Sequence, residues 1–231
     1  MIKSLHFSAV QTEDWPQEGE SSDHFLSEFK AQCRKREVEG AVRSFARVVD
    51  TGRRVPRNVV GMFVNICGTA GHIEGLDLLH SYLSLHTEEG IGNALLSAMV
   101  SAGQSSRAMS LYQMLVNRGV KLRVGALSAL LGAAAEMKET RLAVELLAQL
   151  QKKRHVPPQQ CCEDVLRLAV ESGEVSLVEG LLSVLRVARS EVELGVAALF
   201  TEWVQRSADM ISISALGQEA IRLCDLQWVM L

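Results

Sequence analysis

A pattern that returns every 35 residues is the strongest constraint on the fold of this chain. It is clearest in 90–124, where apolar residues over 91–99 and over 108–116 recur at the spacing that places them on one face of a helix. Gly103 separates the two runs and Gly119 follows the second, and glycine at such places offers a left-handed end to a helix. The stretch therefore predicts a hairpin of two short helices.

The hairpin pattern fits four further stretches of the chain. A pair of apolar residues in the first helix recurs as Phe63-Val64, Leu95-Leu96, Leu130-Leu131 and Val165-Leu166. The predicted repeats are 23–57, 58–89, 90–124, 125–159 and 160–194. A hairpin of this size buries its apolar faces only when it stacks on its neighbours. The sequence therefore predicts an all-α fold, an α-solenoid of about five hairpins.

The details of the repeat distinguish between two helical-hairpin families. Tetratricopeptide repeats carry a Trp and a mid-helix Gly where this chain has the large apolar pair. The tails Gly52-Arg-Arg-Val-Pro56 and Gly119-Val-Lys-Leu122 are similar to the Gly-x-x-Pro tail of pentatricopeptide repeats, although Pro56 comes one residue late and Leu122 replaces the proline. Over 23–194 the chain resembles the pentatricopeptide repeat family. We therefore expect a right-handed superhelix whose first helices line the concave face.

The resemblance implies an RNA-binding protein in which each repeat contacts one base, through a polar residue of its first helix and a partner at its end. The matching pairs are Leu26 with Pro56, Gly61 with Glu88, Asn93 with Arg123, Ser128 with Pro158, and Glu163 with Glu193. None is a standard pair, and only Asn93 and Ser128 keep a side chain suited to a base edge. Candidate RNA-binding residues are therefore Asn93, Ser128, Arg123 and Lys121. We expect weak, shape-directed binding without strong sequence preference.

Charge is distributed unevenly along the chain. A net charge of -3 does not match a strong nonspecific nucleic-acid binder. Basic residues nevertheless gather in the first repeat, where Arg53, Arg54 and Arg57 are candidate contacts for RNA phosphates, with solvated helix surface as the alternative. We predict that RNA affinity depends chiefly on these three arginines. A second basic cluster at 152–154 and the acidic C-terminal half are interpreted as solvated helix surface.

The two ends of the chain differ from the repeats. Residues 1–22 predict a disordered lead whose only Lys or Arg is Lys3, unlike the Arg-rich transit peptides of mitochondria and chloroplasts, the compartments that the resemblance implies. Cytoplasm or nucleus is the alternative. Residues 195–231 predict a degenerate repeat or helical cap with Trp203 and Trp228 in its core. The chain has no apolar run near 18 residues, so neither a signal peptide nor a membrane span is predicted.

The sequence carries no pattern typical of a catalytic or metal site. Its five cysteines lack C-x-x-C spacing, which predicts reduced thiols and no zinc site. The spacing of His72, His80 and His86 is not that of helical metal ligands, and no phosphate loop or nucleophile motif occurs. Asp209 and Asp225 stand alone, without the aspartate cluster of a metallonuclease. We expect no cofactor, no metal and no enzyme active site.

Three functions remain open. The first is an RNA-binding adaptor in RNA processing or maturation, with a single-stranded or structured RNA such as tRNA or rRNA as its partner. The second is a protein–protein scaffold that binds through the acidic C-terminal half. The third is the RNA-binding part of a longer RNA-processing enzyme, as in protein-only ribonuclease P, which resembles this chain in its repeats and processes the 5′ end of tRNA.

Overall fold

The computed structural model describes residues 22–52, 54–86, 89–188 and the single residues Val196, Phe200, Thr201 and Trp203. The chain divides into two compact units, Met1–Val55 and Pro56–Leu231, each of which is described by itself. The predicted lead at 1–22 lies outside the described residues except for Ser22, and so does most of the predicted cap at 195–231.

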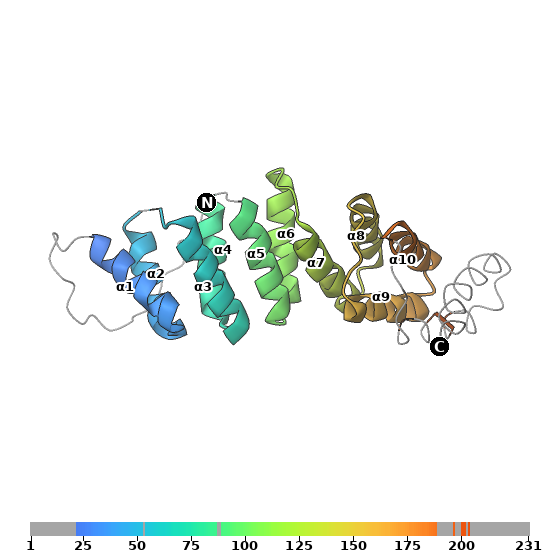
Figure 1. Ribbon diagram of the computed structural model, residues 1–231, viewed down its shortest axis with the longest axis horizontal. Coiled ribbons are helices and arrows are strands. Elements are labelled where there is room, and N and C mark those ends of the chain that lie inside the picture. Colours follow the sequence, from blue (N-terminus) through green and yellow to red (C-terminus); the bar gives the residue numbers. More distant parts are fainter. Residues whose placement is uncertain are drawn as a thin grey trace, which may run out of the picture. The chain divides into compact units, whose positions relative to one another are not determined.

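The described residues form ten helices and no strand, which confirms the all-α prediction (Figure 1). The first unit holds α1 (Ser22–Lys35) and α2 (Val38–Asp50). The second unit holds α3 (Arg57–Ala70), α4 (Ile73–Leu85), α5 (Glu89–Ser101), α6 (Ser105–Asn117), α7 (Val124–Glu136), α8 (Thr140–Lys152), α9 (Gln159–Ser172) and α10 (Val175–Ala188). Each predicted repeat corresponds to one pair of helices. The first helix of each pair begins one residue before the predicted start of the repeat.

Glycine ends the helices where the sequence predicted a left-handed stop. Gly119 follows α6 with a φ of 69°, and Gly52 follows α2 with a φ of 68°. Inside the hairpins, Gly71, Gly103 and Gly173 have φ values between 63° and 69°. An L side chain rarely adopts this conformation, so these positions favour glycine.

Three hairpin positions without glycine adopt the same backbone conformation. Arg36 and Lys138 in hairpin turns, and Arg154 after α8, have φ values of 59°, 59° and 52°. All three residues are cationic and lie next to a helix C-terminus, where the exposed carbonyl groups attract positive charge. The chain therefore places a cation at each of these strained positions.

The paired apolar residues of the first helices form the core of the second unit. Phe63, Leu95, Leu130 and Val165 are each 0% exposed. Neighbouring first helices α3, α5, α7 and α9 pack side by side, and α8 also contacts α10 (Figure 1). The second unit is thus a helical-repeat solenoid. The hand of its superhelix stays a prediction.

Helices α3 and α5 approach each other closely at Gly68. A Cβ atom at that position would lie 2.6 Å from Ala98 Cβ and 3.2 Å from Ala98 Cα. Gly61, two turns earlier on the same helix, has no such neighbour within 4 Å. Small residues therefore set the spacing of these two hairpins at one end of their contact only.

A few residues of the C-terminal region are described. Val196, Phe200 and Trp203 are 4%, 0% and 1% exposed. Burial of Trp203 is what the predicted cap requires, whereas Trp228 lies outside the described residues.

The two glycines of α3 provide a matched test of the stacking. We expect Gly68→Ala to lower the free energy of unfolding, because its methyl group clashes with Ala98 and α5 must shift. Gly61→Ala should raise it by about 0.5–1 kcal/mol, because alanine favours the helix and meets no neighbour there. Urea denaturation of both variants checks this, and equal effects would contradict the described contact.

Candidate nucleic-acid interface

The hairpin geometry sorts the loops of the second unit to two edges. Because the two helices of a hairpin run in opposite directions, the turns inside hairpins lie at one end of the stack and the links between hairpins lie at the other. We call the first the turn edge; its turns are 71–72, 102–104, 137–139 and 173–174. We call the second the connector edge; its links are 118–123, 153–158 and the one that begins at His86.

The connector edge is basic. The Lys and Arg residues described in its links and in the adjoining helical turns are Arg57, Arg118, Lys121, Arg123, Lys152, Lys153, Arg154 and Arg186. Glu89 is the one acidic residue described in the same segments. The edge therefore carries a strong positive charge although the whole chain has a net charge of -3.

Five of these cations are exposed side chains without an ion pair. They are Lys121, Arg123, Lys152, Lys153 and Arg154, which contribute to none of the salt bridges found among the described residues. Arg154 has the left-handed backbone conformation noted above. Exposed cations that have no internal partner are available to an external anion.

The turn edge has the opposite character. Its cations are paired: Arg107 Nε lies 3.0 Å from Asp77 Oδ1, and Lys138 Nζ lies 2.8 Å from Glu171 Oε2. The hydrogen bond and charge of Lys138 lower the pKa of the Glu171 carboxyl group. Glu74, Glu136, Glu139 and Glu174 add further negative charge at this edge. An anion would therefore be repelled from the turn edge.

Two carboxylates in the second turn of α9 form ion pairs within their own helix. Glu163 and Asp164, in the second turn of α9, contact Arg167 on the same helix at 3.4 Å and 3.0 Å. They therefore do not pair with the cations of the links.

The three arginines singled out in the first repeat are not described as one cluster. Arg53 lies outside the described residues, and Arg54 is exposed in the first unit. Arg57 starts α3 in the second unit, where its guanidinium group covers Gly90, since a Cβ atom at Gly90 would lie 1.8 Å from Arg57 Nη2. A shared phosphate site formed by these residues stays a prediction.

Asn93 is directed to the backbone of its own repeat. Its side chain is 4% exposed. Nδ2 donates to the Glu89 carbonyl at 2.7 Å and to the Lys121 carbonyl at 3.2 Å, and Oδ1 accepts from the Arg123 amide at 2.7 Å. Contact with a base, as predicted from the resemblance, would require the amide group to leave these bonds.

The equivalent residues of the other repeats are buried, lack a polar side chain or are paired within the protein. Ser128 is 7% exposed and its Oγ has no hydrogen-bond partner. Gly61 has no side chain, and Glu163 pairs with Arg167. In this conformation the predicted base-reading positions therefore present little to a base edge, which favours the expected lack of strong sequence preference.

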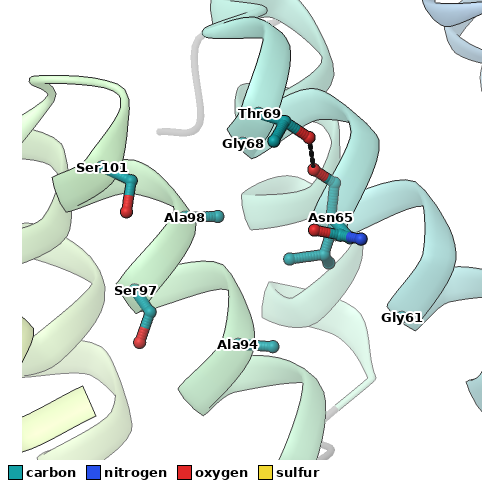
Figure 2. A pocket seen from close by; sticks show the side chains of 9 residues that line it. Gly61, Asn65, Gly68, Thr69, Ala94, Ser97, Ala98 and Ser101 are labelled. Atoms are coloured by element: carbon teal, nitrogen blue, oxygen red, sulfur yellow. Dashed lines mark hydrogen bonds between the residues drawn. The ribbon is translucent and has the colours of Figure 1, made fainter. Parts of the chain in front are cut away.

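The first helices enclose a shallow groove between α3 and α5 (Figure 2). Its volume is about 360 Å³, and its polar groups are the side chains of Asn65, Thr69, Ser97 and Ser101. Figure 2 shows Thr69 bonded to the Asn65 carbonyl of its own helix. The groove has no charged side chain among its lining residues, so it lacks the cations that a phosphate contact needs.

Arg118 has a structural role that the sequence analysis missed. Its Nη1 donates to the Leu83 carbonyl at 2.7 Å, and its Nη2 donates to the Ser84 carbonyl at 2.8 Å. These carbonyl groups belong to the last turn of α4, so Arg118 caps the helix of the preceding hairpin. Its partners lie 34 and 35 residues away and carry no side-chain signal in the sequence.

Side chains that could bind a metal ion are dispersed over the described part of the chain. Within the described residues no group of three or more His, Cys, Asp or Glu side chains could hold a metal ion. Cys33, Cys67, Cys161 and Cys162 are buried thiols, and burial raises the pKa of Cys33 and of Cys161 to about 12. Such thiols stay protonated near neutral pH. In the same part of the chain, no helix has both the length and the apolar character to cross a membrane.

Solved structures share this arrangement. The chain is similar to the PPR domain of Arabidopsis thaliana protein-only RNase P 1, solved in complex with tRNA, with a TM-score of 0.60 and 16% identity over 80% of this chain and 100% of that one. By fold, this is a pentatricopeptide-like repeat protein. The nuclear proteinaceous RNase P 2 of A. thaliana also has a TM-score of 0.60, at 13% identity over 79% of this pentatricopeptide-like chain and 41% of that protein. Neither protein-family models nor curated sequences match the chain.

Arg154 allows the strain at the connector edge to be tested. We expect Arg154→Gly to raise the free energy of unfolding by about 1 kcal/mol, because glycine adopts a positive φ without the penalty of a side chain. Arg154→Lys, the matched control, keeps the charge and the strain and should leave stability unchanged. Thermal melting of both variants checks this, and a less stable Arg154→Gly variant would contradict it.

Proposed function

We propose that this protein is an RNA-binding repeat protein that holds a folded RNA through its phosphates, along the connector edge, and acts as an adaptor in RNA processing or maturation. The observation that carries the proposal is the sorting of charge between the two edges of the second unit. Unpaired Lys and Arg side chains line the links between hairpins, whereas the cations of the hairpin turns are paired with carboxylates.

The arrangement fits phosphate contacts because it repeats along the stack. Lys121 and Arg123 lie in one link, and 152–154 leads into the next. Successive hairpins thus offer cations at the same edge, as a chain of regularly spaced phosphates requires. Phosphate contacts supply most sequence-independent affinity, and they do not read bases.

Two features favour a folded RNA over a specific single strand. The polar group of Asn93 is engaged within the protein, and that of Ser128 is buried. One similar structure, that of a protein-only RNase P repeat domain, was solved with tRNA. A structured partner such as tRNA or rRNA agrees with both.

The second candidate function is the RNA-binding part of a longer processing enzyme. The chain spans 41% of the length of the similar nuclear RNase P 2 and the whole length of the similar repeat domain. In that case the nuclease chemistry would lie in another domain. The compartment stays a prediction, since the family resemblance implies an organelle and one similar protein is nuclear.

Two triple variants test the proposed surface. We expect replacement of Lys152, Lys153 and Arg154 by Gln to weaken binding of an RNA hairpin and to reduce the slope of log K against log salt by about 2–3, because three phosphate contacts are lost. Arg141, in the first turn of α8, is a third cation of the turn edge and lies 3.8 Å from Glu145. Replacement of Arg107, Lys138 and Arg141 by Gln removes the same charge from the turn edge and should leave the slope unchanged. Fluorescence anisotropy over a salt series measures both.

Two outcomes of this assay contradict specific statements, and a further variant tests the sequence-based prediction. Equal losses of RNA affinity in both triple variants would mean that binding depends on the net charge of the protein and not on the connector edge. Failure of the wild-type protein to bind RNA at low salt would favour the protein-scaffold function. Replacement of Arg53, Arg54 and Arg57 by Glu tests the sequence-based prediction that these arginines carry most of the affinity.

Sequence preference gives an independent test. We expect two RNA hairpins with the same secondary structure and unrelated sequences to bind with affinities that agree within about fivefold, since one specific base contact alone is worth about 1–3 kcal/mol. Competition binding at fixed salt measures the ratio. An enriched motif of several defined bases in an unbiased RNA selection would contradict a phosphate-based mode.

A further inference from the structure

The link between the third and fourth hairpins of the chain has an alternating structure. Val120 and Leu122 are buried, each 7% exposed, whereas Lys121 and Arg123 are exposed. Arg123 itself is extended, with φ of -83° and ψ of 159°. The two apolar residues therefore anchor the link, and the two cations point to the opposite side, as in an extended segment.

The polar backbone groups of this link are held by one side chain. Asn93 donates to the Lys121 carbonyl at 3.2 Å and accepts from the Arg123 amide at 2.7 Å. Its remaining hydrogen bonds the Glu89 carbonyl at 2.7 Å, which fixes the side chain to α5. Asn93 thus connects the first helix of the repeat to the backbone of Lys121 and Arg123, 28 and 30 residues away.

The next repeat shows why an asparagine is needed here. The residue before α9 is Pro158, which has no amide hydrogen to satisfy, and the residue equivalent to Asn93 is Ser128, whose Oγ has no partner. In the first repeat the sequence pairs Leu26 with Pro56 in the same way. Of these three pairs, only Asn93 with Arg123 has an amide N–H at this place, and the Asn93 side chain accepts from it.

We infer that Asn93 is a positioning residue of the RNA-binding surface, which fixes the 118–123 link so that the Lys121 and Arg123 side chains meet RNA phosphates in a set arrangement. The inference rests on the proposed function of the connector edge. It gives Asn93 a different role from a base contact, because a positioning residue affects all RNA sequences alike.

The first measurement needs no RNA. Amide hydrogen exchange of Arg123 should become at least about fivefold faster in Asn93→Ala, because the amide loses its acceptor. The amides of 128–133 in the middle of α7 should exchange as in the wild type, which serves as the internal control. Unchanged exchange at Arg123 would overturn the inference.

The second measurement couples Asn93 to the cations. Asn93→Ala should weaken binding of an RNA hairpin by about three- to tenfold, to the same extent for unrelated sequences, since two long side chains lose their fixed arrangement. The Lys121→Ala/Arg123→Ala variant keeps the backbone amide at position 123 but lacks both cations. In this background, Asn93→Ala should cause no further loss of RNA affinity. Both are measured well below the melting temperature, so that global unfolding does not contribute.

The possible results separate the inference from the proposed function. A further loss in the double-variant background, a change of sequence preference or an unchanged affinity of Asn93→Ala would each overturn the positioning role and leave the basic edge intact. Wild-type affinity of the Lys121→Ala/Arg123→Ala variant would show instead that this link does not bind RNA, so the positioning role would fail together with that part of the proposed surface.

Discussion

Burial of the first-helix faces between neighbouring hairpins is the interaction on which the rest of the second unit depends. Its helices are 13 or 14 residues long, a length at which an isolated helix is marginal in water. Stacking supplies the missing stability through residues such as Phe63, Leu95 and Leu130, which are fully buried. The close approach at Gly68 shows that the spacing between hairpins is set by side-chain size.

Stacking of the hairpins also brings charged segments that are separate in the sequence to the same edge of the second unit. Along the sequence the residues of 118–123 and 152–154 are separate clusters, and the net charge of -3 conceals them. Stacked hairpins place both clusters at one edge and place the carboxylates of 136–139 and 171–174 at the other. A weakly acidic chain can therefore present a basic edge, which is the condition for phosphate binding that net charge alone fails to reveal.

Polar side chains between the hairpins mainly satisfy backbone groups that the helices leave open. Arg118 caps carbonyl groups of α4, and Asn93 bonds the link before α7. Links lack a hydrogen-bonding ladder of their own, so their amide and carbonyl groups need such partners. This demand explains why a side chain at a predicted base-reading position is occupied inside the protein.

The sequence by itself determined the features that depend on neighbouring residues. Helical periodicity predicted the hairpins and the buried pairs such as Leu95-Leu96, and glycine predicted the left-handed stops at Gly52 and Gly119, because both signals follow from local backbone geometry. Only the tertiary structure decided that Lys138 and Arg154 adopt the glycine conformation, that Asn93 faces Lys121 and Arg123, and that the basic clusters share an edge. The last two features join groups about 30 residues apart, and their positions are fixed only when the hairpins stack.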